Sequence, residues 1–186
     1  MKNKIAIINY SPYHTASTLL VNILVGLIPK LTTTNIKGIW KGGWPHLNPD
    51  CNVVVVKAHP DSRGDIDKIM HIYGDKFDKM YFVCSERQSI NAVIPNKFKG
   101  YDNVIVFQFE ELLESESNPV LDIVSTVHNR LREYISEEDV DLDIELGVKR
   151  MNDMNKRYSE IKDKPFSFID RKYEIHGSHR NRKNHQ

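Results

Sequence analysis

Residues 4–28 read KIAIINYSPYHTASTLLVNILVGLI, and this stretch decides the fold. A β-branched apolar run, Ile5–Ile8, leads through the polar loop YSPYHTAST into a long apolar run, Leu19–Ile28. The first run predicts a strand and the second a helix. Phosphate-binding loops are built as a strand, a tight loop and a helix, but this loop contains neither glycine nor lysine. The loop either binds an anion or only turns the chain.

The composition is typical of one soluble globular domain. The chain has 186 residues, 40% of them hydrophobic and 27% charged, which is enough to bury a core without disulfides or metal. Its net charge of +1 gives no overall attraction to nucleic acid or membranes, so we expect neither partner. The two cysteines, Cys51 and Cys84, are isolated and favour a reducing compartment. Leu19–Ile28 is too short to span a bilayer, and we expect a cytoplasmic protein.

Four short apolar runs bounded by turn residues predict strands at Ile5–Ile8, Val53–Val56, Met80–Cys84 and Val104–Phe109. The runs are continuous rather than alternating, which is typical of strands buried on both faces of a parallel sheet. Helical patterns between and after them cover residues 19–28, 66–73, 89–94, 120–135 and 148–161. Alternating strands and helices predict a three-layer α/β/α domain with a central, mostly parallel sheet.

The domain is expected to cover residues 1–175, with a basic polar tail at residues 176–186. Thr32–Asp50 contains three glycines, two prolines and two tryptophans, and is interpreted as a long surface loop. Its tryptophans would form an aromatic platform for an acceptor, or would pack down against the domain. The acidic stretch 137–145 is interpreted as a helix entrance, with Ser136 and Asp139 at the spacing of a capping box.

The loop before the first predicted helix is rich in hydroxyl groups. If the helix begins near Ser17, its free N–H groups point into the loop. The hydroxyls of Thr15, Ser17 and Thr18 would then join those groups around a phosphate or sulfate. The same residues are equally typical of a Ser/Thr N-cap before a buried helix. Taken alone, the loop favours the helix cap.

The second predicted strand ends in Lys57, Ala58 and His59. Ligands of open α/β sheets bind at the carboxyl ends of strands. A lysine there would neutralise a leaving anion, and histidine is the usual general base near neutral pH. Either residue alone fits a polar strand end, but both together favour a functional site.

Two further basic segments are candidate anion sites. Arg87 follows the third predicted strand and is suited to bidentate phosphate contact, and Ser89 would cap a helix or bind an anion. The tail carries His176, His179 and Arg180, which would either close over a phosphate or belong to a flexible basic end. No carboxylate or cysteine stands at a matching spacing to the two histidines, so we expect no metal site.

In order and spacing, these residues resemble the sulfotransferase family that uses 3′-phosphoadenylyl sulfate (PAPS). The family's loop P-[KR]-[ST]-G-[ST]-[ST]-x-L is matched by residues 13–20, YHTASTLL, and its K-T-H strand end by residues 57–59. Its R-D-P-R-D-x-x-x-S segment is matched loosely from residue 84. Its Y-E-D-L-like strand end is matched by residues 109–112, FEEL, and its C-terminal basic loop by residues 179–183.

Four positions depart from the family pattern. The loop glycine is Ala16, and the basic residue of the loop is His14. The first arginine of the third motif is Cys84, and its serine falls on Ala92. In the family, the latter two positions grip the 3′-phosphate. Cys84 and Ala92 favour an alternative, a non-catalytic sulfotransferase-like protein that binds a nucleotide or a sulfated ligand.

The resemblance implies a P-loop sulfotransferase-like fold and transfer of a sulfuryl group from PAPS to a hydroxyl or amine of a small-molecule or glycan acceptor, without metal. His59 would take the acceptor's proton, and Lys57 and His14 would stabilise the departing phosphate. The implied donor-binding residues are Thr15, Ala16, Ser17, Thr18, Leu19, Arg87, Ser89 and Arg180. A P-loop small-molecule kinase is disfavoured, because the Walker lysine and a clear Mg²⁺-binding aspartate are absent. The acceptor and the oligomeric state are left open.

Overall fold

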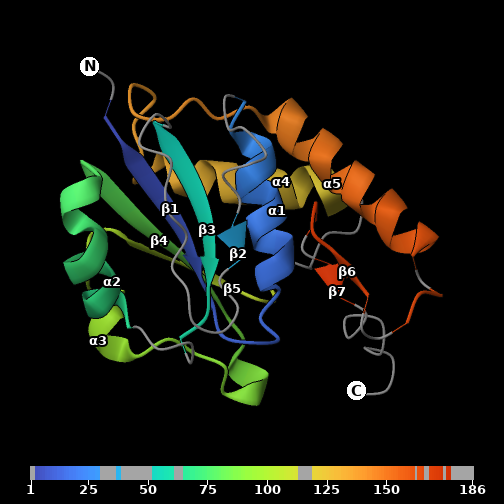
Figure 1. Ribbon diagram of the computed structural model, residues 1–186, viewed down its shortest axis with the longest axis horizontal. Coiled ribbons are helices and arrows are strands. Elements are labelled where there is room, and N and C mark those ends of the chain that lie inside the picture. Colours follow the sequence, from blue (N-terminus) through green and yellow to red (C-terminus); the bar gives the residue numbers. More distant parts are fainter. Residues whose placement is uncertain are drawn as a thin grey trace.

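The computed structural model describes residues 3–29, 37–38, 52–60, 65–112, 119–161, 163–165, 168–173 and 175–176. In this part of the chain the centre is a parallel five-stranded sheet in the order β2-β3-β1-β4-β5 (Figure 1). Its strands are β1 (Ile5–Tyr10), β2 (Lys37–Gly38), β3 (Val53–Ala58), β4 (Lys79–Glu86) and β5 (Val104–Gln108).

Helices cover both faces of the sheet, so the predicted three-layer α/β/α fold is confirmed (Figure 1). The helices are α1 (Ser17–Leu27), α2 (Ile66–Tyr73), α3 (Asn96–Lys99), α4 (Pro119–Arg132) and α5 (Ile144–Glu160), with 3₁₀ turns η2 (Gly74–Lys76) and η3 (Gln88–Ile90). Helices α1, α4 and α5 share one core with the sheet, and α2 and α3 share the other. A separate antiparallel pair, β6 (Ile169–Asp170) and β7 (Ile175–His176), lies beside α1 and α5 (Figure 1).

The central strand shows why the apolar runs are continuous. All six residues of β1 are buried. Ile5 and Ile7 pack in the core under α1, whereas Ala6, Ile8 and Tyr10 pack in the core under α2. Because both faces are covered, every position of the strand except Asn9 is apolar.

Two glycines allow helices α1 and α5 to pack closely. A Cβ on Gly26 would lie 2.9 Å from Arg150 Cβ and 3.0 Å from Gly147 Cα, and a Cβ on Gly147 would lie 2.8 Å from Val124 Cγ1. The helix axes can approach this closely only because neither position carries a side chain. This contact fixes the place of α1, whose first turn borders the candidate site.

The predicted helix at residues 89–94 is wrong. The chain makes only the 3₁₀ turn η3, which is followed by Asn91 with a φ of 53°. The backbones of Arg87 and Ala92 then pair as an isolated bridge, and α3 begins only after Pro95. The proline excludes helical backbone for the residue before it, so the helix forms on its far side.

The acidic stretch 137–145 does lead into a helix, but the capping residues were predicted wrongly. Ser136 Oγ donates to Asp139 Oδ2 at 2.8 Å, but this pair closes a turn. Helix α5 begins later, at Ile144, where Asp143 Oδ1 accepts from the backbone N–H of Leu146 at 3.0 Å. Within the described residues, no helix has the length and apolar character needed to cross a membrane.

Two predicted segments fall largely outside the described residues. Within Thr32–Asp50, residues 37–38 form β2, which pairs with β3, and the other positions are not described. In the predicted tail, His176 belongs to β7, so regular pairing extends one residue past the expected boundary. Residues 177–186 are not described.

Candidate anion-binding site

The candidate site lies where the carboxyl ends of β1, β3 and β4 meet. From β1 the chain passes through α1, on one face, toward β3; from β4 it passes through α3, on the other face, to β5. The neighbouring strands β1 and β4 therefore diverge in their connections, which makes their carboxyl ends the switch point of the sheet. Open α/β sheets bind ligands at such points.

The loop between β1 and α1 adopts two left-handed conformations without glycine. His14 has a φ of 65° and Ala16 a φ of 63°. Each such residue costs about 1 kcal/mol or more, so contacts around the loop must hold it in place. Ala16 is the N-cap of α1 and supplies no side-chain hydrogen bond. The interpretation as a Ser/Thr N-cap is therefore wrong, and the N–H groups of the first turn have no side-chain cap from that position.

Buried hydroxyl groups hold this loop against β4. Ser11 Oγ accepts from the backbone N–H of Ser85 at 2.9 Å. Thr15 Oγ1 donates to the carbonyl of Pro12 at 2.8 Å and lies 3.0 Å from Ser85 Oγ. Because Thr15 uses its only hydroxyl proton on Pro12, Ser85 is the donor of the second bond. Ser11, Thr15 and Ser85 are all fully buried, so Thr15 supports the loop from below.

Asn9, the next-to-last residue of β1, extends this buried network. It is fully buried, and its Nδ2 donates to Ser11 Oγ and to the carbonyl of Val83, each at 3.3 Å. Sequence reasoning missed Asn9, Ser11 and Ser85. The available signal was that a polar residue, Asn9 or Ser85, directly follows each of the apolar runs Ile5–Ile8 and Met80–Cys84.

Lys57 brings a cation to the first turn of α1. Its side chain is buried, with 2% of the residue exposed, and its Nζ donates to Thr18 Oγ1 at 2.8 Å. The amino end of a helix carries partial positive charge, so Lys57 and α1 both favour an anion at this place. The structure thus brings the predicted loop and the predicted strand end together.

His59 lies beneath the same loop. Its Nδ1 is 2.7 Å from the carbonyl of Ser11. A carbonyl only accepts, so Nδ1 carries the proton and the lone pair of the neutral ring is at Nε2. The ring of Tyr13 stacks on His59 with centroids 4.2 Å apart and an interplanar angle of 24°. His59 is 2% exposed and Tyr13 is 41% exposed, so Tyr13 covers the imidazole.

The other predicted residues that the structure describes lie on the loop, in the first turn of α1 and directly after β4. His14 is exposed at the loop, Ser17 is buried, and Thr18 and Leu19 are half-buried. Arg87 is half-buried: its Nε donates to Ser89 Oγ at 3.1 Å, and its guanidinium carbon lies 4.3 Å from the centre of the Phe109 ring. Arg180 falls outside the described residues.

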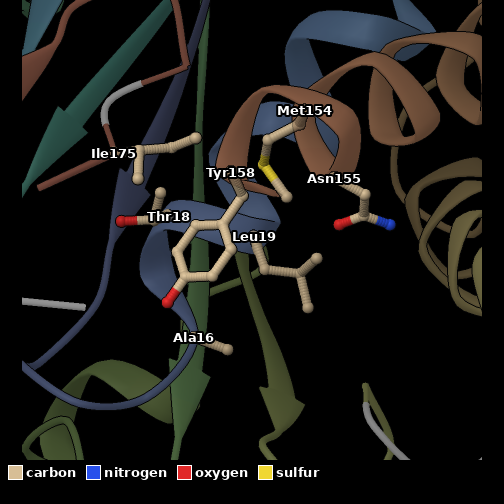
Figure 2. Close-up of a pocket in the computed structure, with 7 residues that line it drawn as sticks. All are labelled: Ala16, Thr18, Leu19, Met154, Asn155, Tyr158 and Ile175. Carbon is tan, nitrogen blue, oxygen red and sulfur yellow. The ribbon is translucent and has the colours of Figure 1, made fainter. Parts of the chain in front are cut away.

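A pocket of about 220 Å³ opens beside the first turn of α1. It is lined by Ala16, Thr18, Leu19, Met154, Asn155, Tyr158 and Ile175 (Figure 2). In Figure 2 the hydroxyl end of the Tyr158 ring points toward the Ala16 end of the loop. The walls are mainly apolar, with one amide and two hydroxyls. Sequence reasoning missed the residues from α5 and β7, because no local motif shows which face of a helix meets α1.

The fold and this geometry define a three-layer α/β/α protein with a candidate anion site at the carboxyl edge of its sheet. In the part of the chain that the structure describes, no three His, Cys, Asp or Glu side chains converge as metal ligands would. The chain matches no protein-family model, no curated protein and no solved structure. A function must therefore be argued from the site itself.

Proposed function

We propose that this protein is a sulfotransferase that moves the sulfuryl group of PAPS to a hydroxyl or amine of an acceptor. The observation that carries the proposal is the 2.8 Å hydrogen bond from Lys57 Nζ to Thr18 Oγ1. It joins a buried cation from β3 to the first turn of α1, where N–H groups have no side-chain cap from the N-cap residue. Such an arrangement favours binding of an anion and stabilises charge on a departing phosphate, which supports the proposal.

In the proposed reaction the acceptor oxygen or nitrogen attacks sulfur in line with the leaving group. The bond from sulfur to the bridging phosphate oxygen breaks, and adenosine 3′,5′-bisphosphate departs with that oxygen and its electron pair. Lys57, the amino end of α1 and the exposed His14 stabilise the charge that builds on the phosphate. The scheme requires no metal.

His59 takes the proton of the acceptor in this scheme. Its Nδ1 bond to Ser11 leaves the lone pair of the neutral ring at Nε2, which is the form of a general base. Tyr13 covers the ring in the structure, so the acceptor reaches His59 only when Tyr13 moves aside.

The pocket beside α1 supplies a place for the nucleoside end of the donor. Its apolar walls suit a flat ring, and Asn155 and Tyr158 offer polar groups at its edge. Thr18 lines the pocket and also accepts from Lys57, so the pocket adjoins the proposed phosphosulfate position. Arg87 and Ser89, with Arg180 from the undescribed tail, are the proposed contacts to the remaining phosphate.

A second candidate is a non-catalytic protein that binds the same nucleotide or a sulfated ligand. The observation in its favour is the burial of His59 beneath Tyr13, which keeps the proposed base away from any acceptor. Both candidates require nucleotide binding, and they differ only in turnover.

The binding experiment is calorimetric titration of the protein with adenosine 3′,5′-bisphosphate, with EDTA and then with Mg²⁺. We expect saturable binding of one nucleotide that is the same in both buffers. Absence of binding contradicts both candidates. Binding that depends on Mg²⁺ favours a P-loop kinase instead.

A further inference from the structure

Asn22, in the middle of α1, joins two distant parts of the chain. It is 1% exposed, and its Nδ2 donates to the carbonyl of Thr18 at 2.8 Å and to the carbonyl of Tyr173 at 2.7 Å. Its Oδ1 accepts from Arg150 Nη2 at 3.0 Å. A buried amide with both protons and its oxygen engaged is held in one orientation.

Arg150 completes the connection from α5. The same Nη2 donates to the carbonyl of Lys172 at 2.8 Å, and the guanidinium carbon lies 5.1 Å from the centre of the Tyr173 ring. Asn22 and Arg150 therefore hold consecutive carbonyls, at residues 172 and 173, in the turn between β6 and β7. We call this segment, residues 168–173 and 175–176, the C-terminal hairpin.

The C-terminal hairpin forms one wall of the pocket. Ile175 lines the pocket and packs in a small core with Tyr173 and Ile161, against which Met154 and Tyr158 are placed. The turn is closed internally, because Asp170 Oδ1 accepts from the N–H groups of residues 172 and 173. Because Asp170 also pairs with Ile175, displacement of the turn would move Tyr173 and Ile175 away from Ile161 at the end of α5.

We propose that Asn22 and Arg150 are positioning residues that set the nucleoside end of the donor site. The inference rests on the proposed function, since it assumes that a nucleotide occupies the pocket. Asn22 binds the carbonyl of Thr18, and Thr18 both lines the pocket and accepts from Lys57. The side-chain amide of Asn22 thus connects the C-terminal hairpin to the first turn of α1, which would hold the phosphosulfate.

This arrangement predicts different effects on the affinity for a nucleotide and on the affinity for a ligand that has no nucleoside. Loss of the connection frees the hairpin wall, so the nucleoside loses its fit in the pocket. The loop, Lys57 and the amino end of α1 remain, so a ligand that contacts only them keeps its affinity. A general loss of stability would weaken both ligands alike.

The test compares Asn22→Leu and Arg150→Met by calorimetry with two probes, adenosine 3′,5′-bisphosphate and inorganic pyrophosphate. We expect each variant to bind the nucleotide about tenfold more weakly and pyrophosphate within about twofold of the wild type. Arg132→Met is the matched control. Arg132 Nη1 also donates to a backbone carbonyl, that of Val140, at 2.7 Å, and neither residue lines the pocket. The control should bind both probes as the wild type does.

Arg150→Met keeps Asn22 and its two donated bonds, so it supplies the measurement if Asn22→Leu does not fold. Equal weakening of both probes, or no weakening of either, overturns the inference. A wild type that binds the nucleotide no more tightly than pyrophosphate overturns it as well. If the variants lose affinity for the nucleotide alone while the wild type transfers no sulfuryl group to any acceptor, that result supports the positioning role and contradicts the proposed enzymatic function.

Discussion

At the scale of single residues, the site depends on polar groups buried at strand ends. Thr15 was expected to bind the donor, but its hydroxyl is directed toward Pro12 and Ser85 inside the protein. Lys57 has the opposite role, because its ammonium group is brought to the first turn of α1. Local sequence gives the residue types but not the direction in which each side chain points.

Lys57 supplies the charge that the proposed donor site requires. We expect Lys57→Met to weaken binding of adenosine 3′,5′-bisphosphate about ten- to a hundredfold, because a charge-assisted hydrogen bond contributes about 1.5–3 kcal/mol. Calorimetry of both proteins measures the change, and the exposed Lys76→Met, before the amino end of β4, is the control. Unchanged affinity in Lys57→Met would place the anion elsewhere.

His59 is the proposed base, so its removal should affect transfer more than binding. We expect His59→Ala to reduce the turnover number at least about a hundredfold, which is the usual contribution of a general base. Its affinity for adenosine 3′,5′-bisphosphate should stay near that of the wild type. His71→Ala, an exposed histidine on α2, controls for loss of an imidazole. Full activity in His59→Ala removes this residue from the role.

At the scale of elements, the position of the site depends on how closely α1 and α5 pack. Gly26 and Gly147 allow the helices to touch, and Asn22 and Arg150 bind across the same contact. None of these four residues stands in a motif, and they become a group only when the two helices meet. The strands were predictable because burial on both faces leaves an uninterrupted apolar run.

Gly26→Ala should separate the two helices. The new methyl would lie 3.0 Å from the Cα of Gly147, a backbone atom that cannot turn aside. Overpacking of this kind costs about 1–3 kcal/mol, which exceeds the gain in helix propensity of about 1 kcal/mol. Urea unfolding measures the change. Gly74→Ala, where nothing lies within 4 Å, should leave the free energy of unfolding unchanged or slightly raised. Equal effects at both glycines would contradict the close packing.

Asp139 connects the start of β4 to the turn before α5. The hydrogen bond from Lys79 Nζ, at 2.6 Å, is the main reason that the pKa of Asp139 lies below its usual value, and bonds from Asn3 and Ser136 act in the same direction. Because the folded pKa is lower than the unfolded one, the contribution of Asp139 to stability is present above about pH 4 and is lost as the pH falls through the folded pKa.

The consequence is measurable in the variant Asp139→Asn, which cannot titrate. Its deficit in free energy of unfolding relative to the wild type should be largest near neutral pH and should shrink below about pH 4. Chemical denaturation at several pH values follows this difference. A deficit that stays constant from neutral to acidic pH would show that the carboxylate charge contributes nothing.

At the scale of the whole molecule, the sequence predicts the layers better than the site. Local patterns are enough to predict four of the strands and the first helix. The apolar runs behind these strands start at Ile5, Val53, Met80 and Val104, and the helix starts at Ser17. The pocket does not, because Tyr158 and Ile175 lie on elements from the other end of the chain and meet α1 only in the folded protein. The helix start at Asp143 was missed because Ser136 and Asp139 carry a similar capping pattern and close a turn instead.

Mass spectrometry of a panel of acceptors tests whether the protein transfers the sulfuryl group. Phenols, aliphatic amines and simple sugars are incubated with PAPS and the protein in EDTA, with Lys57→Met as the parallel sample. We predict that at least one acceptor gains the mass of one sulfuryl group, that adenosine 3′,5′-bisphosphate appears in equal amount, and that the variant gives neither product. Tight binding of PAPS with no sulfated product from any acceptor class would contradict sulfuryl transfer by this protein.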